Sequence, residues 1–324
     1  MEPTTLQEAI VYFSNPDNCR DYLVARRWPN GVECPTCGNK EGIGFLKTQS
    51  RWQCRYKHSK RQFSLKTGTI FEDSPLGLDK WLMTMWLIGN CKNGVSSYEI
   101  ARDVHVTQKS AWFMLQRIRQ VMQDESHGGK LGGNGAPVQV DETFIGGKSR
   151  NMHKGKRDAL KRAGDLKTGG IGKAVVIGAL ERGGKVRTAV GSDRRKKTIA
   201  PFIRENVMQG ANLHTDEHQT EWWRGDEYAH EMVNHLERYV DGNVHTNGIE
   251  NFWSLLKRGI GGTYVSVEPF HLFRYVDEQA FRFNNRGPMT DAQRFSYLCR
   301  KVVGKRLTYA ELTGKEAASE EDAF

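Results

Sequence analysis

Three acidic residues, Asp141, Asp216 and Glu250, have the types and positions that metal-dependent phosphoryl transfer requires. Asp141 ends one predicted strand, Asp216 follows another, and Glu250 opens a predicted helix. Carboxylates from two neighbouring strands and one helix can hold two Mg²⁺ ions about 3.5 to 4 Å apart, and Mn²⁺ can take their place. Lys257 lies two helical turns after Glu250, so we expect its ammonium group on the same face, where it could bind DNA.

The third acid has alternatives close by in the chain. Asn247 lies one turn before Glu250, and its amide oxygen could ligate a metal ion instead. Glu142 and Glu217 directly follow the two aspartates. A third carboxylate balances two Mg²⁺ ions and a phosphodiester better than a neutral amide does, and this favours Glu250.

A second group of residues, Cys34, Cys37, Cys54 and His58, has the types and spacing of a zinc site. Three thiolates and one imidazole can surround Zn²⁺ tetrahedrally, and a small zinc ribbon needs this structural metal because it buries little apolar surface. The alternative is two surface cysteines, Cys34 and Cys37, with an unrelated Cys54. The flanking Trp52 favours zinc, and His58 is the weakest of the four predicted ligands.

Basic residues surround the predicted zinc site, and a helical hairpin follows it. The basic residues are Lys47, Arg51, Arg55, Lys57, Lys60, Arg61 and Lys66. Residues 97–119 predict a short helix, a turn and a longer helix that could enter a DNA major groove, with Gln108, Lys109 and Ser110 reading bases. A helical hairpin that makes no DNA contact is the alternative.

A further basic run extends from Lys148 to Lys173. Its place directly after Asp141 favours contacts to a phosphodiester backbone over a merely solvated loop. The residues expected to contact DNA there are Lys154, Lys156, Arg157, Lys161 and Arg162.

Composition limits the class of protein. The 324 residues include 48 Lys and Arg against 38 Asp and Glu, and the net charge of +10 favours polyanionic partners. Six cysteines without a disulfide pattern indicate a reducing compartment. The most apolar stretch, residues 81–88, is far shorter than the roughly 20 residues that span a bilayer, so we expect a cytoplasmic protein with no membrane partner.

The hydrophobic pattern predicts helices before a glycine-rich connector and a mixed α/β unit after it. The helices are expected over residues 79–88, 98–104, 107–123, 198–208, 249–260 and 270–283. The strands are expected over residues 138–141, 174–180, 186–190 and 211–215.

Three segments resemble those of bacterial DDE insertion-sequence transposases of the fifteen-ninety-five group. They are VDETFIGGK (residues 140–148), HTDEH (residues 214–218) and HTNGIENFWSLLKRGIGGTY (residues 245–264). The stretch from Phe63 to Trp81 is also similar to the family's junction between ribbon and helix. By this resemblance, Asp141, Asp216 and Glu250 would be the metal-binding triad and Lys257 the accompanying lysine.

The resemblance also implies the fold and the domain organisation. The fold class would be α/β, with an RNase H-like mixed-sheet catalytic domain preceded by a small zinc ribbon and a helix-turn-helix. The expected parts are N-terminal helices and zinc ribbon (1–75), helix-turn-helix (76–125), glycine-rich linker (126–136), catalytic domain (137–300) and C-terminal segment with an acidic tail (301–324). One departure is Lys57, which stands where the family's ribbon has its fourth cysteine.

The function implied is that of a nucleoid-associated bacterial DNA transposase. Its partners would be double-stranded DNA, namely the terminal inverted repeats and the target, with the protein a homodimer or larger on DNA. Three alternatives remain open at the level of sequence: a zinc-ribbon regulator derived from a transposase, an RNase H-like nuclease without strand transfer, and a serine or tyrosine recombinase.

Overall fold

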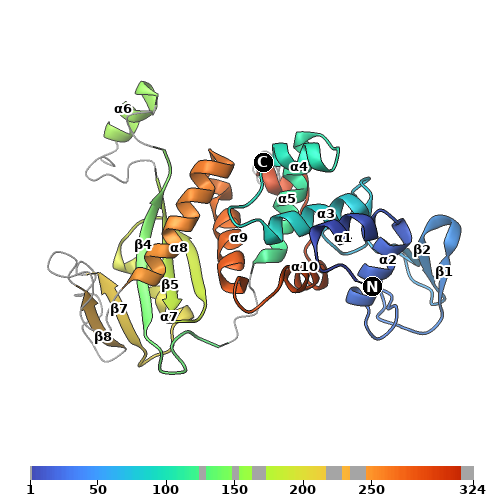
Figure 1. Ribbon diagram of the computed structural model, residues 1–324, viewed down its shortest axis with the longest axis horizontal. Coiled ribbons are helices and arrows are strands. Elements are labelled where there is room, and N and C mark those ends of the chain that lie inside the picture. The colour runs from blue at the N-terminus through green and yellow to red at the C-terminus, as the bar shows by residue number, and fades with distance from the viewer. Residues whose placement is uncertain are drawn as a thin grey trace, which may run out of the picture. The chain divides into compact units, whose positions relative to one another are not determined.

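The computed structural model describes residues 2–123, 129–147, 153–162, 173–216, 228–233 and 246–314. They divide into two compact units, of which the first comprises residues 1–122 and 287–324 and the second residues 123–286 (Figure 1). The catalytic domain expected from the sequence ended at Arg300, whereas the second unit ends at Arg286. The boundary differs because α10 (Asp291–Arg300) packs on α2 and α3 of the first unit.

The first unit has an aromatic core that the C-terminal helix α10 completes. α1 (Leu6–Phe13) begins at a Thr5 capping box, and α2 (Pro16–Arg27) follows with Asn15 as its N-cap. Phe295 of α10 contacts Phe13 at a ring-centroid distance of 5.6 Å and Trp86 of α3 (Leu78–Asn90) at 5.0 Å. Helices from both ends of the chain therefore share one core.

The ribbon is a three-stranded antiparallel sheet. Its strands β1 (Ile43–Leu46), β2 (Arg51–Cys54) and β3 (Gln62–Phe63) are neighbours in that order. The buried Trp52 ring lies 5.0 Å from the Phe45 ring and 6.1 Å from the Phe63 ring, measured between centroids. The flanking aromatic residues thus form a small core, as the sequence indicated.

A helical hairpin completes the first unit. α4 (Ser97–Asp103) begins at a Ser96 capping box, and α5 (Gln108–Met122) follows a turn in which His105 has a φ of 52°. Arg117 of α5 donates to the carbonyls of Ile70, Glu72 and Leu307, so it ties two remote segments to the helix. The short α11 (Tyr309–Thr313) lies beyond one of these segments.

The second unit contains a five-stranded mixed sheet. Its strands are β4 (Val138–Ile145), β5 (Ala174–Glu181), β6 (Val186–Gly191), β7 (Asn212–Asp216) and β8 (Ala229–Val233), in the spatial order β6-β5-β4-β7-β8. β5 runs antiparallel to both β4 and β6, whereas β4, β7 and β8 run parallel to one another. Four of these strands were predicted, and β8 was not.

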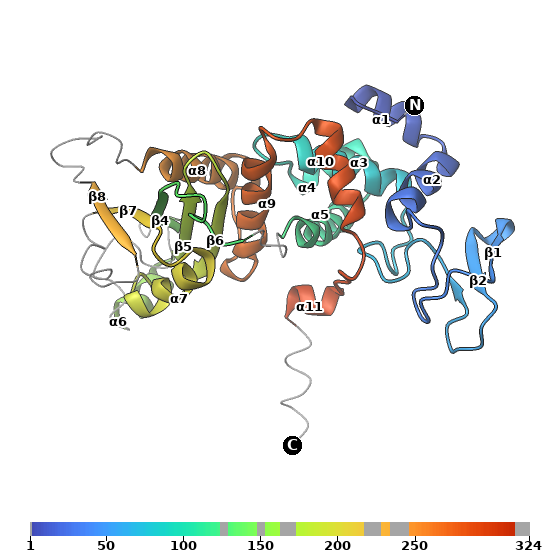
Figure 2. The same ribbon diagram turned by 90° about the horizontal axis from the view of Figure 1, so that it is seen from below.

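Helices cover both faces of this sheet (Figure 2). α7 (Lys196–Asn206) packs on one face, where Val138 and Val140 share a core with Ile199 and Ile203. α8 (Asn247–Arg258) and α9 (Leu272–Asn285) pack on the other. A π-helical segment, residues 259–264, and a 3₁₀ turn, residues 269–271, follow α8, and α6 (Lys154–Arg162) lies in the basic run after β4.

Part of the glycine-rich connector is packed. Leu131 is 4% exposed, its N–H donates to the Asn206 carbonyl, and its carbonyl accepts from the Met208 N–H. The expected linker, residues 126–136, is therefore anchored at Leu131 to the core beside α7. Every helix in the described part of the chain is too short or too polar to span a bilayer.

Candidate active site and metal cluster

The four predicted zinc ligands come together in the ribbon. Ligand atoms of Cys34, Cys37, Cys54 and His58 all lie within 4.8 Å of one another, and they are the one such group of three or more among the described Cys, His, Asp and Glu side chains. Cys34 Sγ is 3.4 Å from His58 Nε2, and Cys37 Sγ is 3.7 Å from Cys54 Sγ. The turn before β1, the end of β2 and the loop between β2 and β3 thus bring together three sulfurs and one nitrogen.

These distances match a tetrahedral zinc site. Zn–S bonds of about 2.3 Å and Zn–N bonds of about 2.0 Å separate two sulfurs by about 3.8 Å and a sulfur from a nitrogen by about 3.5 Å. The backbone N–H of Asn39, aided by its side chain, lowers the pKa of Cys37 to about 7, which favours the thiolate that binds metal. Lys57, in contrast, is exposed beside this cluster.

The basic residues around the cluster divide into two groups. Lys66 is half-buried, and its Nζ donates to the carbonyls of Ser74 and Leu76, so it stabilises the fold. The others are exposed: Lys47, Arg51, Arg55, Lys57, Lys60 and Arg61. The ribbon therefore has a solvent-accessible cationic surface of the kind that binds phosphates.

Asp141 lies in the middle of β4. The sequence predicted that the strand ends at Asp141, but it continues to Ile145 because residues 142–145 pair with β5. Asp141 Oδ1 accepts the backbone N–H of Glu142 at 2.8 Å, and Oδ2 accepts the indole N–H of Trp253 at 2.9 Å. Trp253 is one of the apolar positions at helical spacing in α8, but its contact with Asp141 was not predicted.

The register of the sheet relates Asp141 to Asp216. β4 pairs with β7 in parallel through Val138 with Leu213 and Gln139 with His214. The same offset continued by two residues matches Asp141 with Asp216, the last residue of β7. The side chain of Asp216, like all of Glu217, lies outside the described part of the chain.

α8 is docked closely on β4 and β5 by two small residues. A Cβ added to Gly178 would lie 2.7 Å from the Trp253 ring and 2.9 Å from Ile249. A Cβ added to Gly248 would lie 2.7 Å from both Gln139 Oε1 and Leu180 Cδ2. The Ile249 N–H donates to Gln139 Oε1 at 2.9 Å, which fixes the first turn of the helix on the sheet.

The remaining candidates of this site lie along α8. Glu250 is exposed beside the anchored Ile249, and its Oε1 accepts the hydroxyl of Thr246 at 2.8 Å. Asn247 and Lys257 are exposed on the same helix, one turn before and two turns after Glu250.

Glu142 lies apart from this group. Its Oε1 is 3.7 Å from Arg194 Nε, and Arg194 precedes α7 and lies over the Phe144 ring. Because side chains alternate along a strand, Glu142 projects from the face of β4 opposite to that of Asp141.

The base-reading candidates of α5 are engaged within the first unit. Gln108 Nε2 donates to Ser97 Oγ at 2.9 Å, and Ser110 Oγ is 2.9 Å from Thr107 Oγ1. Lys109 is exposed, with its Nζ 4.7 Å from the centroid of the Tyr309 ring of α11.

The basic run after β4 was expected to be a loop, but it contains α6. Lys154 and Arg162, at its two ends, are exposed. The side chains of Lys156, Arg157 and Lys161 lie outside those described.

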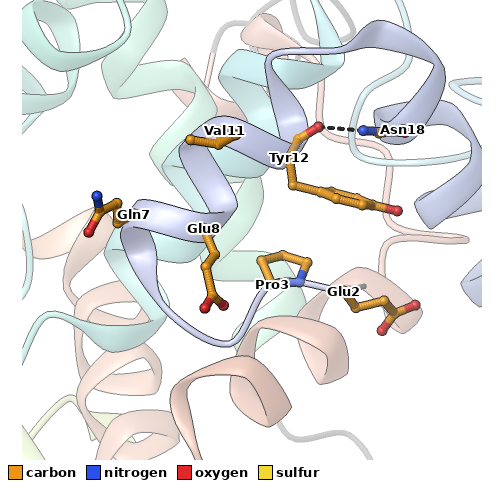
Figure 3. A pocket seen from close by; sticks show the side chains of 7 residues that line it. All are labelled: Glu2, Pro3, Gln7, Glu8, Val11, Tyr12 and Asn18. Carbon is orange, nitrogen blue, oxygen red and sulfur yellow. Dashed lines mark hydrogen bonds between the residues drawn. The ribbon is translucent and has the colours of Figure 1, made fainter.

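A surface pocket of about 540 Å³ lies at the N-terminus (Figure 3). Its two acids already have partners: Glu2 forms an ion pair with Arg26 at 2.6 Å, and Glu8 accepts the Thr5 N–H as part of the α1 cap. Asn18 Nδ2 donates to the Tyr12 carbonyl. The pocket therefore offers structural contacts and no arrangement for catalysis.

Two family models match this chain, one within each unit. The family model described as a transposase zinc-ribbon domain matches residues 14–56, and the one described as an ISXO2-like transposase domain matches residues 130–284. Together the two matches cover more than half of the chain. An uncharacterized protein in transposable element ISH50 of Halobacterium salinarum is 27% identical over 261 residues, which is 77% of this chain and 84% of that protein.

A zinc ribbon joined to a transposase-type α/β domain defines a class of insertion-sequence protein. The chain belongs to the IS1595 transposase family, the fifteen-ninety-five group that its motifs resemble. Membership implies DNA binding, and the Cys34, Cys37, Cys54 and His58 cluster fits the structural Zn²⁺ of the ribbon.

Proposed function

We propose that the protein is a DDE-type DNA transposase that binds the terminal inverted repeats of an insertion sequence and performs two-metal-dependent strand cleavage and strand transfer. The observation that carries this proposal is the parallel pairing of β4 and β7 through Val138 and Gln139, because the same offset continued by two residues aligns Asp141 with Asp216. Residues at one level of neighbouring strands project from the same face of a sheet. α8 is anchored beside Asp141 by Trp253 and carries Glu250.

The catalytic unit is proposed to be RNase H-like. The strand order β6-β5-β4-β7-β8, with β5 antiparallel to its two neighbours and helices on both faces, supports this assignment. In this arrangement Asp141, Asp216 and Glu250 would hold two Mg²⁺ or Mn²⁺ ions. Two such ions activate the attacking oxygen and stabilise the leaving oxygen of an in-line displacement. Lys257 would hold the DNA beside them.

Recognition is assigned to the first unit and to α6. The exposed cations of the ribbon supply phosphate contacts, which give affinity without sequence preference. α4 and α5 would form a helix-turn-helix whose exposed Lys109, with Gln108 and Ser110, reads bases. α6 would contact the target or the repeat backbone, and two copies of the chain would join two element ends.

Cleavage and joining of DNA that carries the element's ends test this proposal. Asp141→Asn, Asp216→Asn and Glu250→Gln should each abolish Mg²⁺-dependent nicking while repeat binding changes less than about twofold, because metal binding and recognition lie in separate units. Glu142→Gln is the matched control and should cut normally, since Glu142 projects from the opposite face.

Three outcomes would contradict parts of the proposal. Nicking without joining to a target would indicate a nuclease that lacks strand transfer. Repeat binding with no nicking by the wild-type chain in Mg²⁺ or Mn²⁺ would indicate a regulator. Normal nicking by Glu250→Gln together with none by Asn247→Ala would identify Asn247, and not Glu250, as the third metal ligand.

A further inference from the structure

The carboxylate of Asp141 is held from both sides by groups of this chain. Trp253 Nε1 donates to Oδ2 at 2.9 Å, and the Glu142 backbone N–H donates to Oδ1 at 2.8 Å. Trp253 is 4% exposed, so water has little access to compete for the indole N–H. Each carboxylate oxygen has two lone pairs, so a single hydrogen-bond donor does not exhaust its capacity to accept.

The fold makes specific room for this indole. Gly178 of β5 is the register partner of Asp141 of β4, and the Trp253 ring occupies the space that a Cβ at residue 178 would need. Ile249, one turn earlier on α8, is anchored to Gln139 on the same strand. Two contacts, at Gln139 and Asp141, therefore fix α8 along β4. Gly178 on β5 has no side chain, which leaves space for the Trp253 ring.

We propose that Trp253 is a positioning residue that orients the Asp141 carboxylate for a divalent metal ion. This inference rests on the proposed function, in which Asp141 is a metal ligand. Groups that hydrogen-bond to metal ligands fix their orientation and commonly change metal affinity 10- to 100-fold. Because Trp253 sits on α8, the same contact holds the helix of Glu250 at a set position over β4.

The chemistry of indole suits this role. Its N–H is a donor only, so it binds the carboxylate without offering a competing metal ligand. It is also uncharged, and therefore does not repel a cation as a lysine or arginine at the same place would. A histidine there could itself ligate the metal.

The test is a calorimetric titration of Mn²⁺ into the full-length, zinc-loaded protein. Trp253→Phe keeps an aromatic ring at this position but is smaller than indole and lacks its N–H, and it should weaken Mn²⁺ binding about tenfold. At saturating Mn²⁺, Trp253→Phe should nick DNA at most of the wild-type rate, because the substitution lowers the apparent affinity for the metal and not the rate once metal is bound. Phe252→Leu is the control, because it removes buried aromatic surface from the same helix without touching Asp141.

Two further measurements distinguish loss of the indole hydrogen bond from misfolding of the variant. Gly178→Ala keeps the indole but places a methyl group where the ring lies, so it should weaken Mn²⁺ binding as Trp253→Phe does. In ¹⁵N-tryptophan-labelled wild type, the Trp253 indole resonance, identified by its absence from Trp253→Phe, should shift when Mg²⁺ is added. Asp141→Asn should abolish that shift.

The outcomes separate this inference from the proposed function. If Trp253→Phe and Gly178→Ala bind Mn²⁺ as tightly as wild type while Asp141→Asn loses binding, Trp253 does not position the carboxylate and the metal site stands. If Trp253→Phe does not fold, Mn²⁺ binding by Gly178→Ala decides. Wild-type Mn²⁺ binding by Asp141→Asn would overturn both the inference and the assignment of Asp141.

Discussion

Removing the imidazole of His58 tests whether the ribbon holds zinc through a Cys₃His set. His58 Nε2 is 3.4 Å from Cys34 Sγ, close to the spacing of a sulfur and a nitrogen on one Zn²⁺ ion. Structural zinc contributes about 10 to 16 kcal/mol to small domains of this kind, so one ligand of four accounts for roughly 3 kcal/mol. His58→Ala should therefore lower zinc affinity about a hundredfold.

The assay is competition for zinc between the reduced full-length protein and a chromophoric chelator. Lys57→Ala is the matched control, because Lys57 is the exposed neighbour of His58 in the chain and should leave affinity unchanged. Replacement of Zn²⁺ by Co²⁺ gives a second readout, since the visible spectrum should report three thiolates and one nitrogen in wild type.

A clear result would refute this reasoning. If His58→Ala binds zinc within about twofold of wild type, His58 is not a ligand, and the fit of its distance to a tetrahedron is coincidental. If the purified wild-type chain carries no stoichiometric zinc and takes none up, the whole cluster is misassigned.

Three other perturbations have defined outcomes. Gln108→Ala with Lys109→Ala should reduce preference for the terminal repeat over random DNA about tenfold in competition binding, and an equal loss for both DNAs would show that α5 does not read bases. Arg117→Met should lower unfolding free energy by about 3 kcal/mol in urea titrations, because three carbonyls lose their donor; a change under 1 kcal/mol would contradict this. Burial raises the pKa of Asp277 to about 6, so its stability cost is present above pH 6 and absent below about pH 4. Asp277→Asn should thus stabilise the protein by about 2 to 3 kcal/mol at pH 8 and not at pH 4, as measured by unfolding at both values.

Local patterns in the sequence were enough to predict most of the elements and the ligand types of the two candidate metal sites. Apolar residues at helical or alternating spacing mark which residues a single helix or strand must bury, and this local requirement predicted α3, α5, β5 and α8 to within a few residues. The spacing of Cys34, Cys37, Cys54 and His58 predicted the cluster because ligands close in the chain need only a hairpin to meet. β8 was not predicted. Asp141 was predicted to end a strand, but the strand continues to Ile145, because the pairing of residues 142–145 with β5 is not a local property of the sequence.

Contacts between residues distant in the sequence depend on how the whole chain folds. β4 and β7 pair in parallel through Val138 and Gln139, an offset that aligns Asp141 with Asp216 when it is continued by two residues. A hydrophobic pattern does not specify such a partner strand. The indole of Trp253 reaches Asp141 only because Gly178, on a third segment, leaves space for its ring. α10 likewise joins the N-terminal core because Phe295 fits between aromatic rings there. Such contacts follow from shape and register across the folded chain, whereas the local pattern of a sequence records only how much of each segment is buried.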